Sequence, residues 1–262
     1  VSLAVLPFQN LSGDPDQEFF SDGLTEEMIM QLARLPADRV RVIARSSVMP
    51  YKDTKKTVHQ IGQELGVTHM LEGTVRREGD RARITAQLVR VRDQTHVWAE
   101  SFDRELGGIL AAQSEVAQAI ARQIRLTLDT RSAAQLAAVR PVKPEALMAY
   151  LKGRHYWHKF TAEGFSQATG LFKTATEADP SFARAWLGLS DCYRLRGSWW
   201  GDLPPKEAFP PAKEAALEAL RRDPSLGEAH AGLGWIHFVF DWDWGSAESE
   251  FKLGIQLSPN SR

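Results

Sequence analysis

The chain has 262 residues, of which 43% are hydrophobic and 25% are charged, a composition typical of a globular protein rather than a disordered one. Its 32 Lys and Arg residues balance 33 Asp and Glu residues, which excludes the strong basic surplus of a duplex nucleic-acid binder. The single cysteine, Cys192, excludes an internal disulfide framework and a zinc site made of several cysteines. Because the sequence has no run of about 18 or more apolar residues, we expect no membrane span within it.

The first part of the chain alternates predicted strands and helices. Apolar residues within 1–8 predict a short buried strand, and a turn-rich segment follows it. We expect the next helix to begin with Ser21 or Asp22 as its N-terminal cap, because the apolar residues after them follow one helical face. Residues 40–43 predict a second strand, and residues 58–65 predict a short helix that a glycine ends.

Three further strands and a long helix are expected next. Residues 70–77, 81–92 and 96–102 predict a meander of neighbouring strands, and apolar residues at four-residue spacing from Val116 to Leu128 predict the helix. Within 81–92 the alternation of apolar and polar residues slips at Val89, which indicates a β-bulge. These three strands follow one another with no helix between them, which favours a mixed sheet with helices packed on it.

A linker is predicted between two domains. The stretch over 130–145 is polar and rich in alanine, and it ends with Pro141 and Pro144. Two prolines three residues apart stop a helix and stiffen a connection. We therefore expect an α/β domain over 1–129 and an all-α helical solenoid over 146–262.

The predicted helices of the second domain repeat. In three places an alanine stands twelve residues before a proline, and a phenylalanine or a second alanine follows the first alanine at the fourth position. The three pairs are Ala168 and Pro180, Ala212 and Pro224, and Ala247 and Pro259. This spacing matches the tetratricopeptide (TPR) pattern, in which small residues let two antiparallel helices approach and the proline ends the second helix. We predict about three repeats, the second with an insertion near 198–207.

Several short motifs of the first domain are similar to those of a known family. They are Val5-Leu6-Pro7-Phe8, Asn10-Leu11-Ser12-Gly13-Asp14-Pro15, Phe20-Ser21-Asp22-Gly23-Leu24-Thr25-Glu26-Glu27, Leu71-Glu72-Gly73 and Trp98-Ala99-Glu100. With these motifs, residues 3–128 resemble the TolB amino-terminal-like (FlgO-like) domain of bacterial multidomain signalling proteins. The resemblance implies a non-catalytic sensing or partner-binding region that TPR repeats follow. It also implies a separate output module, which is an adenylate or guanylate cyclase, a winged-helix DNA-binding domain or a protein kinase.

Catalytic and metal-binding interpretations find little support in the sequence. The phosphate-binding glycine motifs are absent, so we expect no cofactor. The polar residues Asn10, Ser12 and Asp14 after the first strand leave an enzyme site there as an alternative. Two histidine pairs have spacings at which a metal could be shared, but packing explains them better. They are His155 with His158 and His230 with His237.

Arginines and aromatic residues suggest binding surfaces. Five arginines on the meander could accept an anionic partner, but a solvated face balanced by neighbouring acids is the better interpretation. They are Arg76, Arg81, Arg83, Arg90 and Arg92. Four tryptophans beside helix connections are expected to serve the core. They are Trp199, Trp200, Trp242 and Trp244.

Six residues, two on the first helix of each of the three repeats, are candidates for partner binding. They are expected to face the concave groove in which TPR proteins take peptides, and aromatic and arginine residues are the types that anchor interfaces. They are Arg154 and Trp157 in the first repeat, Asp191 and Arg194 in the second, and Trp235 and Phe238 in the third. The alternative, which the sequence supports equally well, is that other parts of the same protein cover these six residues.

The expected function is therefore a sensory or scaffold region of a bacterial signalling protein, linked to an adenylate cyclase, that binds a protein or peptide. An envelope-assembly adaptor without a signalling role is the alternative, ahead of an enzyme. We expect no nucleic-acid partner for this chain, whereas self-association stays open because the third repeat lacks a polar capping helix. The location is expected to be the periplasmic side of the inner membrane if a membrane helix precedes the chain, and the cytoplasm otherwise.

Overall fold

The computed structural model describes residues 1–126, 140–198 and 201–260 and divides the chain into two compact units. One unit comprises Val1–Pro141 with Pro259–Arg262, and the other comprises Val142–Ser258. Most of the predicted linker over 130–145 lies outside the described residues. Within the described ranges, no helix is both long enough and apolar enough to cross a bilayer.

The first unit is built on a mixed β-sheet, as predicted. Its strands are β1 (Ser2–Val5), β2 (Gln9–Asn10), β3 (Arg41–Val42), β4 (His69–Glu78), β5 (Arg81–Arg90) and β6 (Thr95–Glu105). The order across the sheet is β3-β1-β4-β5-β6, and β2 pairs with β4 beyond the end of β1. Strand β1 is parallel to both β3 and β4, whereas β4, β5 and β6 form an antiparallel meander.

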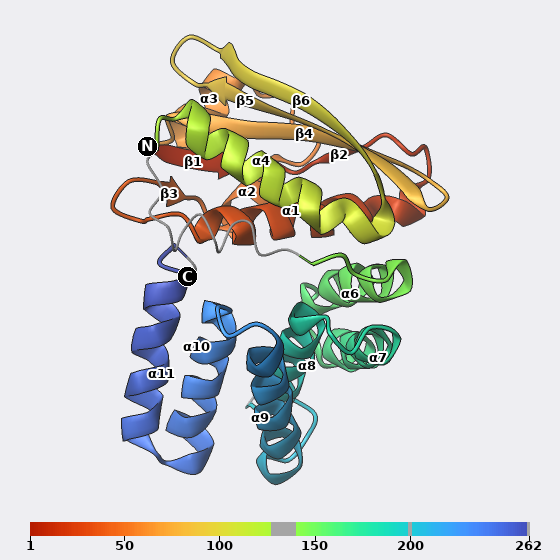
Figure 1. Cartoon of the computed structure of the whole chain (residues 1–262), viewed down its shortest axis with the longest axis vertical. Helices are drawn as coiled ribbons and strands as arrows, with labels where there is room; N and C mark the ends of the chain where they lie inside the picture. The colour runs from red at the N-terminus through yellow and green to blue at the C-terminus, as the bar shows by residue number, and fades with distance from the viewer. Residues whose placement is uncertain (127–139, 199–200, 261–262) are drawn as a thin grey trace. The chain divides into compact units, whose positions relative to one another are not determined.

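Helices cover both faces of this sheet. They are α1 (Glu18–Ala33), α2 (Arg45–Val48), α3 (Val58–Leu65) and α4 (Ile109–Gln123), with short 3-10 turns at Pro15–Gln17, Met49–Tyr51 and Leu106–Gly108. Helices α1 and α4 pack against each other on one face, and α3 lies on the other (Figure 1). All four residues of β1 are buried, because a strand that is covered on both faces has no side for water. Leu128, predicted at the end of α4, lies outside the described residues.

The predicted start of α1 is wrong. The helix begins at Glu18, so Ser21 and Asp22 lie inside it and do not cap it. The physical reason is upstream, where the Asp14 side chain accepts a hydrogen bond from the Asp16 amide and starts a 3-10 turn that runs directly into α1. The short helix α3 agrees with the prediction, since Thr57 caps its start and Gly66 ends it with φ of 64°.

The predicted irregularity at Val89 is present, but the extra residue lies on the neighbouring strand. The pairing of β5 with β6 shifts between Leu88 and Val89, and Val97 of β6 is the residue that is skipped. Leu88 and Val89 are both buried because they point to opposite faces of the sheet, and each face is covered there. On the face of Val89, the side chain of Val91 lies against Gly62 of α3.

The second unit is entirely helical within its described residues. Its helices are α6 (Pro144–Trp157), α7 (Ala162–Ala178), α8 (Ala183–Arg196), α9 (Pro205–Arg222), α10 (Gly227–Ile236) and α11 (Trp244–Leu257), with a π-helical segment at His237–Asp241. Each helix packs against the next one in the chain. Helices α7, α9 and α11 each end two residues before one of the three repeat prolines, as predicted. In the predicted insertion over 198–207, Trp199 and Trp200 lie outside the described residues.

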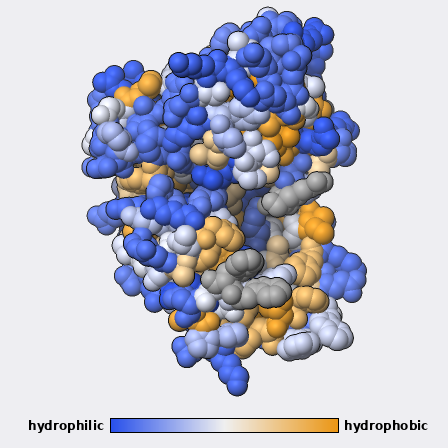
Figure 2. Space-filling model, turned by 180° about the vertical axis from the view of Figure 1, so that it is seen from behind, coloured by the Kyte–Doolittle hydropathy of each residue, from blue (hydrophilic) through white to orange (hydrophobic). Residues whose placement is uncertain are grey.

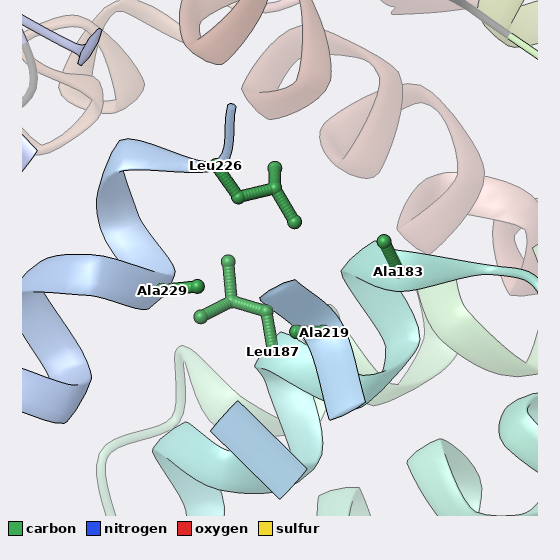
Figure 3. Packing of buried hydrophobic residues seen from close by; sticks show 5 residues of the cluster. All are labelled: Ala183, Leu187, Ala219, Leu226 and Ala229. Carbon is green, nitrogen blue, oxygen red and sulfur yellow. The ribbon is translucent and has the colours of Figure 1, made fainter. Parts of the chain in front are cut away.

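Small residues let these helices approach closely. Figure 3 shows Leu187 of α8 and Leu226, which precedes α10, pointing toward one another among three alanines. The alanines are Ala183, Ala219 and Ala229. Because an alanine side chain ends at Cβ, the two leucines fill the space between α8, α9 and α10 without forcing the backbones apart.

The turns after α7 and α9 have the same hydrogen bonds. Asp179 Oδ1 accepts from the amide of Ser181 at 3.0 Å and from its hydroxyl at 2.7 Å, and Asp223 Oδ1 accepts from Ser225 at 2.9 and 2.6 Å. The residue that follows each turn, Phe182 or Leu226, is the N-terminal cap residue of the next helix. The sequence Asp-Pro-Ser therefore specifies one recurring connection.

A second contact recurs six residues after each of these prolines. The indole nitrogen of Trp186 donates to the Pro180 carbonyl at 3.1 Å, and Nε2 of His230 lies 3.1 Å from the Pro224 carbonyl. The two side chains thus hold their helices to the preceding turn in the same way. The repeat seen in the sequence is therefore also a repeat of contacts.

We expect the first of these turns to make the helical unit sensitive to acid. Burial acts to raise the pKa of Asp179, but hydrogen bonds from Ser181 and from the Lys143 amide outweigh it and hold the pKa below its ordinary value. Because the folded pKa is depressed, the stabilisation is present above the unfolded pKa of about 4 and is lost as the pH falls through the folded pKa.

We therefore expect Asp179→Asn to lower the urea midpoint of the helical unit at neutral pH. We also expect it to shrink the further loss between neutral pH and about pH 3, because the variant has no carboxylate to protonate. Urea titrations at several pH values measure both effects. An unchanged acid dependence in the variant would mean that other carboxylates cause it.

Candidate functional site

The first two candidate residues form a cation–π pair on α6. Arg154 is 9% exposed, and its guanidinium carbon lies 4.5 Å from the centre of the Trp157 ring. The Trp157 ring is half-buried, and its indole N–H has no acceptor among the described residues. Stacking against an arginine restricts both side chains and places a positive charge on this side of the helix.

The second pair forms an ion pair on α8. Arg194 Nη2 lies 3.2 Å from Asp191 Oδ1, and both side chains are half-buried. Between them in sequence, Cys192 is fully buried, and burial together with the charge of Asp191 raises the pKa of its thiol to about 12. The thiol is therefore protonated at neutral pH and is not a nucleophile.

The third pair is aromatic and exposed. Trp235 near the end of α10 is 40% exposed, and Phe238 in the π-helical segment is 50% exposed. Their ring centroids are 6.3 Å apart. Packing within the protein does not explain why two large apolar rings face solvent side by side, and this sets the pair apart from the other four candidates.

The structure brings the three pairs onto neighbouring helices. Helix α8 packs against α6 and against α10, as well as against α7 and α9. The first helices of the three predicted repeats therefore lie next to one another. That the six candidates share one surface stays a prediction, and we call Arg154, Trp157, Asp191, Arg194, Trp235 and Phe238 the six-residue surface.

Two tryptophans that were expected to serve the core are exposed, so that prediction is wrong. Trp242 is 73% exposed and Trp244 is 63% exposed. Trp242 follows the π-helical segment and has φ of 58°, a left-handed conformation that is uncommon for a large residue. The signal that could have shown their exposure is the Asp241-Trp242-Asp243-Trp244 sequence, because buried aromatic residues rarely alternate with carboxylates.

On the face in Figure 2, hydrophobic surface (orange) is more extensive over the helical unit than over the sheet unit.

The histidines have partners that explain their positions. Nδ1 of His230 lies 2.6 Å from Glu250 Oε2 of α11, and Nδ1 of His237 lies 2.8 Å from Asp241 Oδ2. His155 and His158 contact the rings of Tyr156 and Trp157. Within 1–126, 140–198 and 201–260, no group of three or more His, Cys, Asp or Glu side chains is arranged to hold a metal ion.

The polar residues of the alternative enzyme site stabilise the turn in which they lie. Asn10 Nδ2 donates to the Asp14 carbonyl, Asn10 Oδ1 accepts from the Ser12 amide, and Ser12 Oγ accepts from the Arg77 amide. Together with the capping role of Asp14, these bonds give all three side chains a structural function.

The arginines of the meander are balanced by acids, as predicted. Asp103 pairs with Arg81 at 2.7 Å and with Arg83 at 3.1 Å, and Arg76 pairs with Glu78. Arg90 and Arg92 both lie near Asp93. Arg81 and Arg83 share one face of β5, whereas Arg90 lies nine residues from Arg81 on the same unbroken pairing and therefore on the other face, so a single face shared by all five arginines is a wrong prediction. The five form separate groups of ion pairs and not one free cationic patch.

Two comparisons find known proteins that are similar to parts of this chain. Residues 1–119 match the family model described as HilA/YgeH-like transcriptional regulator, second domain. The curated protein "Putative adenylate cyclase 3" of Rhizobium meliloti (strain 1021) is 34% identical over 241 residues. The alignment covers 90% of this chain but 40% of the relative, so the chain spans less than half of that protein.

Two solved structures have a distant likeness to the chain. TolB from Acinetobacter baumannii is 19% identical with a TM-score of 0.33, over 47% of this chain and 28% of that one. The lipoprotein GNA1162 from Neisseria meningitidis is 21% identical with a TM-score of 0.34, over 49% of this chain and 99% of that one. Both TM-scores are too low to support an argument about fold or function.

Proposed function

We propose that this chain is a non-catalytic sensory or scaffold region of a bacterial signalling protein, and that its helical unit is a set of TPR repeats that binds a peptide or protein. The observation that carries the proposal is the exposure of Trp235 and Phe238 on the same row of helices as Arg154 and Arg194. Aromatic and arginine side chains are those that most often dominate binding energy at protein interfaces. The recurring turns after α7 and α9 support the repeat assignment.

The output module is proposed to be an adenylate cyclase. Support comes from the relative named as a cyclase, which aligns with both units of this chain. The match of residues 1–119 to a transcriptional-regulator domain favours a DNA-binding output as the second candidate. The reading frame around this segment decides between them, because each output has its own recognisable domain.

The six-residue surface is tested by the double variant Trp235→Ala and Phe238→Ala. We expect its affinity for a partner to fall about tenfold or more, since exposed aromatic anchors contribute most of the energy of such contacts. Partners captured from the source organism by the unmodified chain would be identified, purified and titrated by calorimetry. Ile255→Ala is the matched control, because Ile255 is 70% exposed but lies outside the surface.

Equal binding by the double variant, the control and the unmodified chain would contradict the proposal. The link to signalling has its own test in the full-length protein. There, the double variant is expected to change the rate of the output reaction at saturating partner, whereas Ile255→Ala leaves it unchanged. If partner binding is lost but the output never responds, the helical unit is a scaffold without a signalling role.

A further inference from the structure

The first unit contains a cavity of about 640 Å³ at the carboxyl end of β1. Its walls come from residues 6–11 after β1, from the middle of β4 and β5, and from the segment Tyr51–Lys56 before α3. After β1 the chain runs to β3, which neighbours β1 on one side, and it later returns to β4, which neighbours β1 on the other side. In open α/β sheets, the point where the strand order reverses is where ligands bind, outside the carboxyl ends of the strands.

The floor of this cavity is a polar patch on two paired strands. Glu72 of β4 lies directly opposite Gln87 of β5, and Thr74 lies opposite Thr85. Gln87 Nε2 donates to Glu72 Oε2 at 3.2 Å, and all four side chains are half-buried. The opposite face of the same strands is apolar and covered by helices, so these polar residues mark the part of this face that α3, whose Ile61 borders the cavity, leaves uncovered.

Carboxylates in the walls neutralise the positive charges of the cavity. Lys52 Nζ lies 2.6 Å from both Glu18 and Asp22, and Lys56 Nζ lies 2.7 Å from Glu64. An anionic ligand would therefore have to break existing ion pairs. Glu72 differs from these carboxylates, because its hydrogen-bond partner among the described residues is the neutral amide of Gln87 and not a lysine.

Tyr51 adds an aromatic wall. Its ring is half-buried beside the cavity, and its hydroxyl donates to Glu64 at 2.7 Å. The paired Glu72 and Gln87 side chains present acceptors and an amide donor, and the two threonines add hydroxyl groups, of which that of Thr85 also bonds to Ser101. The volume lies within the range of about 300 to 1,000 Å³ that small-molecule sites occupy.

We propose that this cavity binds a neutral or amine-bearing polyhydroxylated molecule of the sugar class. The pair Glu72 and Gln87 would bind its hydroxyl or amino groups, and Tyr51 would pack against its ring. The site lies wholly within the first unit. It is independent of the six-residue surface, so either proposal can fail without the other.

Saturation-transfer NMR on the full chain tests the proposal. The probes are D-glucose, N-acetylglucosamine, glucosamine and myo-inositol, with citrate and inorganic phosphate as anionic comparisons. We expect saturation transfer to at least one of the four polyhydroxylated probes, none to citrate, and no broadening of the phosphate ³¹P resonance, which replaces saturation transfer for phosphate because that ion has no carbon-bound hydrogen. Glu72→Gln and Gln87→Leu are each expected to weaken binding about tenfold, because each removes a hydrogen-bonding group from the floor.

Glu100→Gln is the matched control, since it makes the same change as Glu72→Gln on the exposed part of β6, outside the cavity. It is expected to bind as the unmodified chain does. Thermal unfolding of each variant verifies that the fold is kept. The proposal is overturned if none of the four probes binds, if the anions bind instead, or if both floor variants bind as well as the control.

Discussion

Replacing Phe172 with alanine is expected to lower the free energy of unfolding of the helical unit by about 3 to 5 kcal/mol. Phe172 projects from α7 and is fully buried. Its ring lies in a notch made by two glycines, Gly153 of α6 and Gly188 of α8. A Cβ atom on these glycines would come within 2.8 Å and 2.6 Å of the ring, respectively. Because one ring fills the space between three helices, alanine leaves a cavity that none of them can close.

Tryptophan fluorescence during urea unfolding measures this effect, since seven of the eight tryptophans lie after residue 150. Phe160→Ala is the control, because Phe160 is 60% exposed in the same unit. We expect the control to change the free energy of unfolding by less than about 1 kcal/mol. Comparable losses in the two variants would show that Phe172 does not occupy the centre of this core.

The importance of Phe172 was only partly predictable from the sequence. The Ala-x3-Phe spacing predicts that Phe172 fills the gap between antiparallel helices, and it does. Its two glycine neighbours lie nineteen residues before it and sixteen after it in the sequence. Periodicity reports which face of a helix is apolar, but it does not report which residue of another helix that face meets.

The strands were also only partly predictable from the sequence. The alternation in β5 is visible over residues 81–88 and predicts their buried face, and the glycine and threonine around α3 define the ends of that helix. By contrast, the four-residue helix α2 is too short for a period to appear, and the strand predicted over 40–43 is present only at its middle two residues, as β3. The position of β1 between β3 and β4 depends on contacts between distant segments, which local patterns do not contain.

The candidate site was predictable within each helix and not between helices. Residues three apart face the same side, so the pairs Asp191 with Arg194 and Trp235 with Phe238 follow from spacing alone. The exposure of Trp242 does not, because it depends on a π-helical segment and a left-handed residue that break the helical period. The sequence also indicated a site after the first strand, where Asn10 lines the cavity beside β1, but it did not indicate the floor on β4 and β5, because the lining comes from segments far apart in the sequence.

Replacing Gly62 with alanine is expected to lower the free energy of unfolding of the first unit by about 1 to 3 kcal/mol. Within a helix, a change from glycine to alanine normally stabilises by up to about 1 kcal/mol, so the expected sign is the reverse of the usual one. The reason is the close packing of α3 on the sheet. An added Cβ would lie 2.7 Å from Cγ2 of Val91 and closer still to Cγ1, and Val91 is buried and branched at Cβ.

Gly170→Ala supplies the opposite result as a control, because no atom lies within 4 Å of the added carbon there and the helix α7 gains its usual stability. Val91→Ala in the Gly62→Ala background removes the clash, so the double variant is expected to be more stable than the sum of the single changes by about 1 kcal/mol or more. Amide hydrogen exchange of β4 and β5 measures the effect locally. If Gly62→Ala stabilised these strands as Gly170→Ala stabilises α7, then α3 would not be seated on Val91, and the burial of Val89 and Val91 on that face of the sheet would need another cause.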